Sequence, residues 1–170
     1  MESGFAIALV SFMPAKSTHQ ENLIPADWAI GQLPGLTEQD ASRLANLGIQ
    51  TTRQLWQQAH SSARRHWLSA QLKLHPKYVN KWAALANLAQ IPSVGCQYCG
   101  LLLHTGISSP SQLAQTPLDR LHRQVLRFYV TNLQRRDLCP SREDLAQWIQ
   151  QAQALIRRTT PCTHSLEVTE

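Results

Sequence analysis

The sequence predicts an all-α fold built from two similar helical units, and three observations lead to this prediction. Apolar residues recur at helical spacing along several segments, and capping residues or prolines stand where those segments begin. No segment shows the strict alternation of apolar and polar residues that a half-buried strand requires. The chain also aligns with itself, without a gap, when it is shifted by 58 residues.

The self-alignment defines the two units. "LPGLTEQDASRLANLGIQTTRQL" (33–55) lies over "IPSVGCQYCGLLLHTGISSPSQL" (91–113). Each copy has an apolar residue, a proline and a tight turn, then a helix, a Gly–Ile pair and a second helix. Pro34 matches Pro92, and Gly48 matches Gly106. We therefore expect unit one at 33–59 and unit two at 91–116.

Local capping signals support both units. Thr37 and Asp40 have the spacing of a capping box at the start of the first helix. Gly48 stands where a left-handed residue ends that helix. In unit two, Ser109 is placed to cap the second helix, and Pro110 occupies its first position. These agreements predict the same helix–turn–helix arrangement twice.

The remaining segments are predicted from their apolar stripes. A two-helix connector over 61–90 contains helices at 61–72 and 76–90, the second with a broad apolar face. Two C-terminal helices, 117–136 and 141–158, close the fold, and Ser141 with Asp144 forms another capping box. We expect residues 1–22 to be a flexible extension, with a true start at Met13, and residues 159–170 to be a loose tail.

The charge is unevenly distributed. Residues 1–58 carry three Lys/Arg against five acidic residues, whereas residues 59–170 carry thirteen against six. A surplus confined to one part of the chain favours a surface that faces a polyanion, although a solvated helix face gives the same count. No run reaches the roughly 18 apolar residues of a membrane span, so we expect no membrane partner.

The four cysteines indicate a reducing compartment. The N-terminal "GFAIALVSFM" lacks the positive region of a secretory signal, which predicts a cytoplasmic protein with free thiols. The Cys96-x-x-Cys99 spacing suggests half of a zinc site or a redox pair. However, Cys99 aligns with Ala41 at the close packing position, and Cys96 aligns with Glu38 on the first helical turn. We therefore expect Cys99 to be buried, Cys96 to be accessible with a pKa that could be lowered, and no metal or cofactor.

The apolar–Pro–Gly–apolar–Gly turn, followed by a small residue and a closing Gly–apolar pair, resembles the helix-hairpin-helix pattern. This resemblance implies that backbone N–H groups at the turn bind nucleic-acid phosphates without reading sequence. Over 23–156 the chain also resembles a cyanobacterial family of unknown function built from such hairpins. That resemblance rests on "LPGLT…LGIQTT", "KWAALANLAQIPSVGCQYCGLLLHTGI" and "SREDLAQWIQQAQAL". It implies a fold but no reaction.

Each unit departs from the pattern at one glycine. Unit one keeps Gly35 but has Thr37 at the second glycine position, and unit two keeps Gly95 but has Ser93 at the first. Acidic residues follow the turn only in unit one, so we expect unit two to bind phosphate better. The arginines 120, 123 and 127 share one face of helix 117–136. The candidate nucleic-acid site is Ser93, Val94, Gly95, Gln97, Arg120, Arg123 and Arg127, and the weaker second site is Gly35, Leu36 and Thr37.

Other candidate residues have a structural interpretation. Four of the five tryptophans lie on or next to apolar stripes, which favours packing over base stacking, and Trp28 is placed to form a surface anchor or a lid on unit one. Arg64, Arg65, Lys73, Lys77 and Lys81 form a second basic group. No nucleotide-binding glycine loop, catalytic triad or carboxylate cluster is recognisable. We therefore expect neither enzymatic activity nor a small-molecule substrate.

Two function hypotheses remain open. In the first, the chain is a sequence-independent module that binds the phosphate backbone of DNA or RNA through the second turn and the arginine face. In the second, it is a protein–protein interaction scaffold that has lost phosphate binding. The position of the arginines distinguishes them. If Arg120, Arg123 and Arg127 lie on the same side as the Ser93–Gly95 turn, the first hypothesis gains, and if they point away, the second gains.

Overall fold

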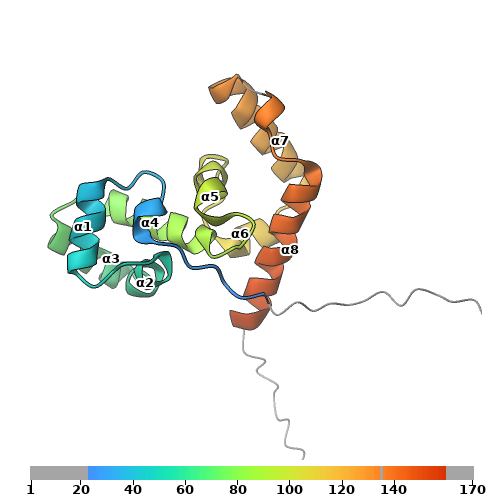
Figure 1. Ribbon diagram of the computed structural model, residues 1–170. Helices are drawn as coiled ribbons and strands as arrows, with labels where there is room; N and C mark the ends of the chain where they lie inside the picture. Colours follow the sequence, from blue (N-terminus) through green and yellow to red (C-terminus); the bar gives the residue numbers. More distant parts are fainter. Residues whose placement is uncertain (1–22, 135, 160–170) are drawn as a thin grey trace, which may run out of the picture.

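The computed structural model describes residues 23–134 and 136–159, and this part of the chain is all-α (Figure 1). Its α-helices are α1 (Glu38–Asn46), α2 (Thr52–Gln58), α3 (Ser62–Leu72), α4 (Pro76–Ala89), α5 (Gly95–His104), α6 (Pro110–Gln115), α7 (Leu118–Phe128) and α8 (Arg142–Thr159). Apart from an isolated bridge between Ala29 and Thr51, the described residues contain no β-structure. The expected extension at 1–22 lies outside the described residues, and so does the expected tail 159–170 apart from Thr159, which ends α8.

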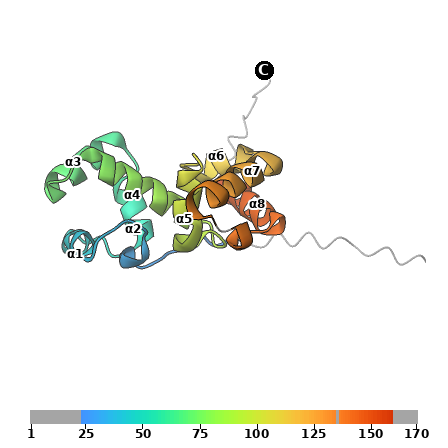
Figure 2. The same cartoon turned by 90° about the horizontal axis from the view of Figure 1, so that it is seen from above.

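The eight helices fall into two halves with the same packing pairs. In the first half, α1 packs on α3, and both α2 and α3 pack on α4. In the second half, α5 packs on α7, and both α6 and α7 pack on α8. The long α4 runs out of the first half to contact α5, so that α1–α3 and α7–α8 lie at opposite ends of the molecule (Figures 1 and 2). The helices expected as a connector and those expected to close the fold therefore hold equivalent positions.

The buried faces of α4 and α8 show the same equivalence in sequence. Val79, Trp82, Ala86 and Ala89 of α4 are all buried, and so are Leu145, Trp148, Ala152 and Leu155 of α8. These two sets are related by a shift of 66 residues rather than 58, because the connection 129–141 is longer than the connection 73–75. An ungapped alignment therefore cannot detect the match.

The single helix expected over 117–136 was a wrong prediction. The α-helix ends at Phe128, a π-helical turn follows at Tyr129–Leu133, and Gln134 adopts a left-handed conformation with φ of 51°. A short 3-10 helix at Arg136–Leu138 then leads to α8. The β-branched pair Val130 and Thr131 weakens α-helical continuation at this point, since branched side chains crowd the preceding turn.

The predicted caps are present, but Thr37 and Asp40 form only one of the two hydrogen bonds of a capping box. Thr37 Oγ1 accepts a hydrogen bond from the backbone N–H of Asp40 at 3.1 Å. Ser109 caps α6, where Pro110 occupies the first turn. Ser141 and Asp144 form the reciprocal pair before α8, with N–O distances of 3.0 and 3.1 Å. Gly48 and Gly106 end their helices with φ of 80° and 91°, a region that glycine enters without steric cost.

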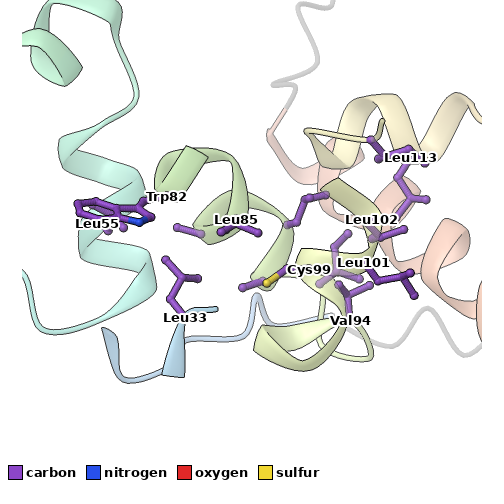
Figure 3. Close-up of a cluster of buried hydrophobic side chains, with 14 of the residues drawn as sticks. Leu33, Leu55, Trp82, Leu85, Val94, Cys99, Leu101, Leu102 and Leu113 are labelled. Carbon is purple, nitrogen blue, oxygen red and sulfur yellow. The ribbon is translucent and has the colours of Figure 1, made fainter. Parts of the chain in front are cut away.

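One continuous apolar core joins the two halves. In Figure 3 its labelled side chains extend from Leu55 and Trp82 in the first half, past Leu85 and Cys99, to Leu102 and Leu113 in the second. Packing explains most of the tryptophans, as expected, but Trp67 is 47 % exposed. No helix among the described residues has the length and apolar character needed to cross a bilayer.

Candidate functional site

The turn of the second half, residues 91–95 (turn two), is closed by α8. The backbone N–H of Ser93 donates to Gln151 Oε1 at 2.9 Å, and Gln151 Nε2 donates to Ser93 Oγ at 2.8 Å. Val94 is buried, and its N–H donates to the carbonyl of Ile91. Two of the amides expected to hold a phosphate are therefore engaged within the protein.

Trp28 closes the other side of turn two. A Cβ atom built on Gly95 would lie 2.8 Å from the Trp28 ring, and Gly95 itself is buried with φ of 50°. The Trp28 indole N–H donates to the carbonyl of Ala89 at 2.9 Å, while its backbone N–H donates to Thr52 Oγ1 at 3.1 Å. We expected a surface anchor or a lid on unit one; the backbone of Trp28 does pair with Thr52 of unit one, but its ring covers the second turn. The close approach that requires glycine at Gly95 is made by an indole ring.

The remaining candidates at or near turn two differ in exposure. Gln97 is exposed on the first turn of α5, whereas Ser93 is half-buried under Gln151. Gly95 donates its N–H to the carbonyl of Ile91 at 2.9 Å. A phosphate approaching this turn would have to displace both Trp28 and Gln151.

The turn of the first half, residues 33–37 (turn one), is open. Gly35 is exposed with φ of 77°, Thr37 is exposed, and Leu36 is half-buried. A Cβ built on Gly35 would lie 3.5 Å from the amine of Lys81, so a cation sits directly beside this turn. The indole N–H of Trp82 reaches the Gly35 carbonyl at 3.4 Å from the buried side.

The acidic residues after turn one are partly satisfied inside the protein. Asp40 accepts a hydrogen bond from Thr37 Oγ1 at 2.7 Å and lies 3.8 Å from the Arg43 guanidinium. Glu38 is exposed at the start of α1. Both carboxylates complement the helix dipole, so they compete with a phosphate for the amides of this turn.

The arginines of α7 do not lie beside turn two. Arg120 lines a polar hollow with Thr105 and Gly106, and Arg127 lines a neighbouring hollow with His104. His104 is the last residue of α5, whereas turn two precedes the first, and a ten-residue helix separates them by about 15 Å. The two parts of the expected site are therefore at opposite ends of α5.

An acidic residue also reduces the charge of the arginine face. Asp119 pairs with Arg142 at 2.5 Å, and this hydrogen bond lowers the pKa of its carboxyl group. The nearby Arg123 and His122 contribute to the same shift in a smaller degree. Because this carboxylate stays ionised among the cations, the arginine face is less positive than its sequence suggests.

The opposite end of the molecule contains a long stretch of sequence that has cations but no acidic residue. The sequence has no Asp or Glu between Asp40 and Asp119. In that interval Arg53 and Arg65 donate to backbone carbonyls, at 2.7 and 2.9 Å. The other four cations of the first half beyond α1 are exposed, and no salt bridge within the described residues involves them: Arg64, Lys73, Lys77 and Lys81. We call these four residues the basic end.

Two cations of the basic end are each paired with an exposed aromatic ring. The Arg64 guanidinium carbon is 6.0 Å from the centroid of the Trp67 ring, and the Lys77 amine is 5.1 Å from that of Tyr78. The sequence pattern places these cations in one basic group, but it favours a packing role for Trp67. The signal that could have identified this region is the long interval without acidic residues, combined with an Arg-x-x-Trp and a Lys–Tyr pair.

The cysteines of α5 behave as packing residues. Cys99 is fully buried, as expected, and its thiol donates to the carbonyl of Cys96 at 3.6 Å. Burial raises the pKa of Cys99 to about 12 and the pKa of Cys96 to about 11. The idea that the helix N-terminus lowers the pKa of Cys96 is therefore wrong, because desolvation of the half-buried thiol outweighs the helix dipole.

Comparison with known proteins assigns a family. Residues 34–155 match the family described as Domain of unknown function (DUF4332), and the chain belongs to this family. The match extends from turn one to the last turns of α8, so the family domain comprises both halves together. No curated protein and no solved structure matches the chain.

Proposed function

We propose that this member of the DUF4332 family is a non-enzymatic module of helix-hairpin-helix type that binds nucleic-acid backbones without sequence preference. The proposed contact surface is the basic end and not the second turn with the arginine face. Each half would be one repeat of four helices, in which only the first repeat keeps its hairpin turn accessible. The binding energy would come from lysine and arginine contacts to phosphates, which release condensed counterions.

The observation that carries the proposal is the unpaired charge of the basic end. Its four cations are exposed and have no carboxylate partner among the described residues. The sequence between Asp40 and Asp119, which carries all four of these cations, contains no acidic residue. Lys81 extends the positive charge to turn one, where its amine lies beside Gly35. A surface of this kind attracts a polyanion more strongly than one in which acids and bases alternate.

The test compares two matched charge reversals in the full chain. The first replaces Arg64, Lys77 and Lys81 by Glu, and the second replaces Arg120, Arg123 and Arg127 by Glu. Fluorescence anisotropy with a labelled duplex at increasing salt gives the affinity and its salt dependence. We expect wild-type binding in the micromolar range or weaker, with a log–log slope of about −3 for three or four phosphate contacts.

The first reversal should abolish binding, whereas the second should weaken it only modestly through the change in net charge. Circular dichroism of both variants controls for unfolding, since all six positions are exposed. Loss of binding in the second variant alone would contradict the proposed location. Absence of any wild-type binding at about 50 mM salt, where screening is weak, would contradict nucleic-acid binding itself.

A second candidate, a protein–protein interaction scaffold, is favoured by a different observation. Val130, Leu133 and Leu138 are 49, 47 and 55 % exposed in the connection between α7 and α8. Large apolar side chains gathered at one tip are typical of a protein contact. In this case a native binding partner would be retained after nuclease treatment and lost when the three residues are changed to Ser. Retention by the triple variant would contradict this candidate.

A further inference from the structure

The basic end contains two rings whose exposure is unusual for their residue types. Trp67 is 47 % exposed and Tyr78 is 44 % exposed, whereas Trp82 and Trp148 are buried and Tyr98 packs on Trp148. Exposing an indole to water forgoes the hydrophobic stabilisation that its burial would give. No packing requirement within the described residues accounts for either ring.

Each of these rings is paired with a cation from its own helix. On α3, Arg64 and Trp67 are three positions apart, with the guanidinium carbon 6.0 Å from the ring centroid. On α4, Lys77 precedes Tyr78, with the amine 5.1 Å from the ring centroid. A cation held beside an exposed ring can contact a phosphate while the ring contacts the attached base.

The two helices that carry these pairs are neighbours. The residues 73–75 connect α3 to α4, and the two helices pack against one another at the same end of the molecule (Figures 1 and 2). Lys73 stands in this connection in a left-handed conformation, with φ of 54°, and its side chain is exposed. The two pairs therefore belong to one two-helix element, and Lys73 adds a cation at the connection between its helices.

A duplex cannot use such rings, because its bases are already stacked and paired inside the helix. A single strand offers the π-face of every base, and stacking on an aromatic side chain is tolerant of sequence. We propose that the basic end binds single-stranded nucleic acid in preference to duplex, with Trp67 and Tyr78 stacking on bases and the neighbouring cations contacting phosphates. This inference rests on the proposed function and specifies its ligand.

The experiment uses the full chain and two labelled probes, an oligothymidylate of about 20 nucleotides and a duplex of the same length, a size above that of one binding surface. Affinities are measured for wild type, Trp67→Ala, Tyr78→Ala and the conservative Trp67→Phe. Leu133→Ala is the matched control, because it truncates a similarly exposed apolar side chain at the other end of the molecule. Intrinsic tryptophan fluorescence is recorded in each titration.

We expect the wild type to bind the single strand more tightly than the duplex. Trp67→Ala and Tyr78→Ala should each weaken single-strand binding by about 5- to 150-fold, the loss of one stacked base, and change duplex binding less than about twofold. Trp67→Phe should retain most of the affinity but lose the fluorescence quenching, since stacking on Trp67 causes it. Leu133→Ala should behave as wild type.

Equal affinity for both probes, or equal losses for both probes in the alanine variants, would overturn the single-strand inference and leave nucleic-acid binding by the basic end intact. Absence of binding to either probe would instead overturn the proposed function. Loss of single-strand binding in Trp67→Phe as complete as in Trp67→Ala would also contradict stacking, because a phenyl ring still presents a π-face.

Discussion

Turn one and turn two begin from similar sequences, yet their surroundings differ. Turn one, residues 33–37, leaves Gly35 exposed beside the amine of Lys81. Turn two, residues 91–95, has Gly95 buried under the Trp28 ring and Ser93 bonded to Gln151. The same local pattern therefore forms an open surface in the first half and a turn covered by other segments of the chain in the second.

The difference arises from segments that are distant in sequence. Trp28 precedes the first unit by a few residues, yet its ring lies against Gly95 of turn two and its indole N–H bonds to the carbonyl of Ala89 at the end of α4. Gln151 comes from the middle of α8, 58 residues after Ser93. Because each contact involves a residue outside the turn, the role of the turn cannot be read from its own glycines.

The largest expected effect on stability is at one position of the repeat, which is Ala41 in the first half and Cys99 in the second. Cys99→Arg should prevent folding, or cost more than about 4 kcal/mol, because it places an unpaired charge in a fully buried position. Ala41→Arg should cost less, since Ala41 is only half-buried and a long side chain there can reach solvent. Chemical denaturation of both variants measures the difference. A soluble, stable Cys99→Arg protein would contradict the placement of this residue in the core.

The second largest difference in unfolding free energy is expected between substitutions of the two turn glycines. Gly95→Ala should cost about 2 to 4 kcal/mol, because it combines a left-handed conformation with an overlap against the Trp28 ring. Gly35→Ala should cost about 1 to 2 kcal/mol, since only the conformational strain applies where the neighbour is a mobile lysine amine. Urea denaturation gives both values.

Trp28→Ala provides the control for this pair. In that background Gly95→Ala should cost only the conformational strain, so the two substitutions should couple by more than about 1 kcal/mol. Additive effects would show that Trp28 does not close turn two in solution.

A smaller effect is expected at the polar contact of turn two. Gln151→Ala should destabilise the protein by about 1 to 2 kcal/mol, because it leaves the half-buried Ser93 N–H without its partner. Lys81→Ala, the matched change beside turn one, should alter stability by no more than about 0.5 kcal/mol, since Lys81 is exposed. The unfolding free energies of both variants are the readout, and similar costs would argue that turn one is also closed.

A separate effect, seen only at alkaline pH, comes from the two cysteines of the second half. The pKa of Cys96 is raised to about 11 and that of Cys99 to about 12, from an ordinary value of 9.0. The folded state therefore retains protons that the unfolded state releases, so this stabilisation is complete below pH 9.0 and is lost as pH rises through 11 to 12. Urea midpoints at rising pH should decline less steeply for the Cys96→Ala/Cys99→Ala double variant. Identical slopes would contradict the assignment.

The sequence was sufficient for much of the fold. Periodic apolar residues and local caps such as Thr37–Asp40 and Ser109 are encoded within a few positions, so their helices could be predicted. The equivalence of α4 and α8 could not, because the longer connection at 129–141 shifts the register of Trp148 relative to Trp82.

The site was predicted less well for a physical reason. Burial of turn two depends on Trp28 and Gln151, and the separation of Arg127 from Gly95 depends on the direction of α5. Exposure of Trp67 likewise depends on which face of α3 meets α4. These are tertiary contacts, which the spacing of residues along one helix does not define.

The most direct test of the account is an NMR titration of the ¹⁵N-labelled full chain with oligothymidylate at about 50 mM salt, where electrostatic binding is strong. We expect the amide shifts to cluster in α3, in the connection 73–75 and in the first turns of α4. Residues 91–97 and α7 should change little. Shifts concentrated at Ser93, Gly95 and Gln97 together with α7 would contradict it, because they would show that turn two opens and binds the phosphate backbone.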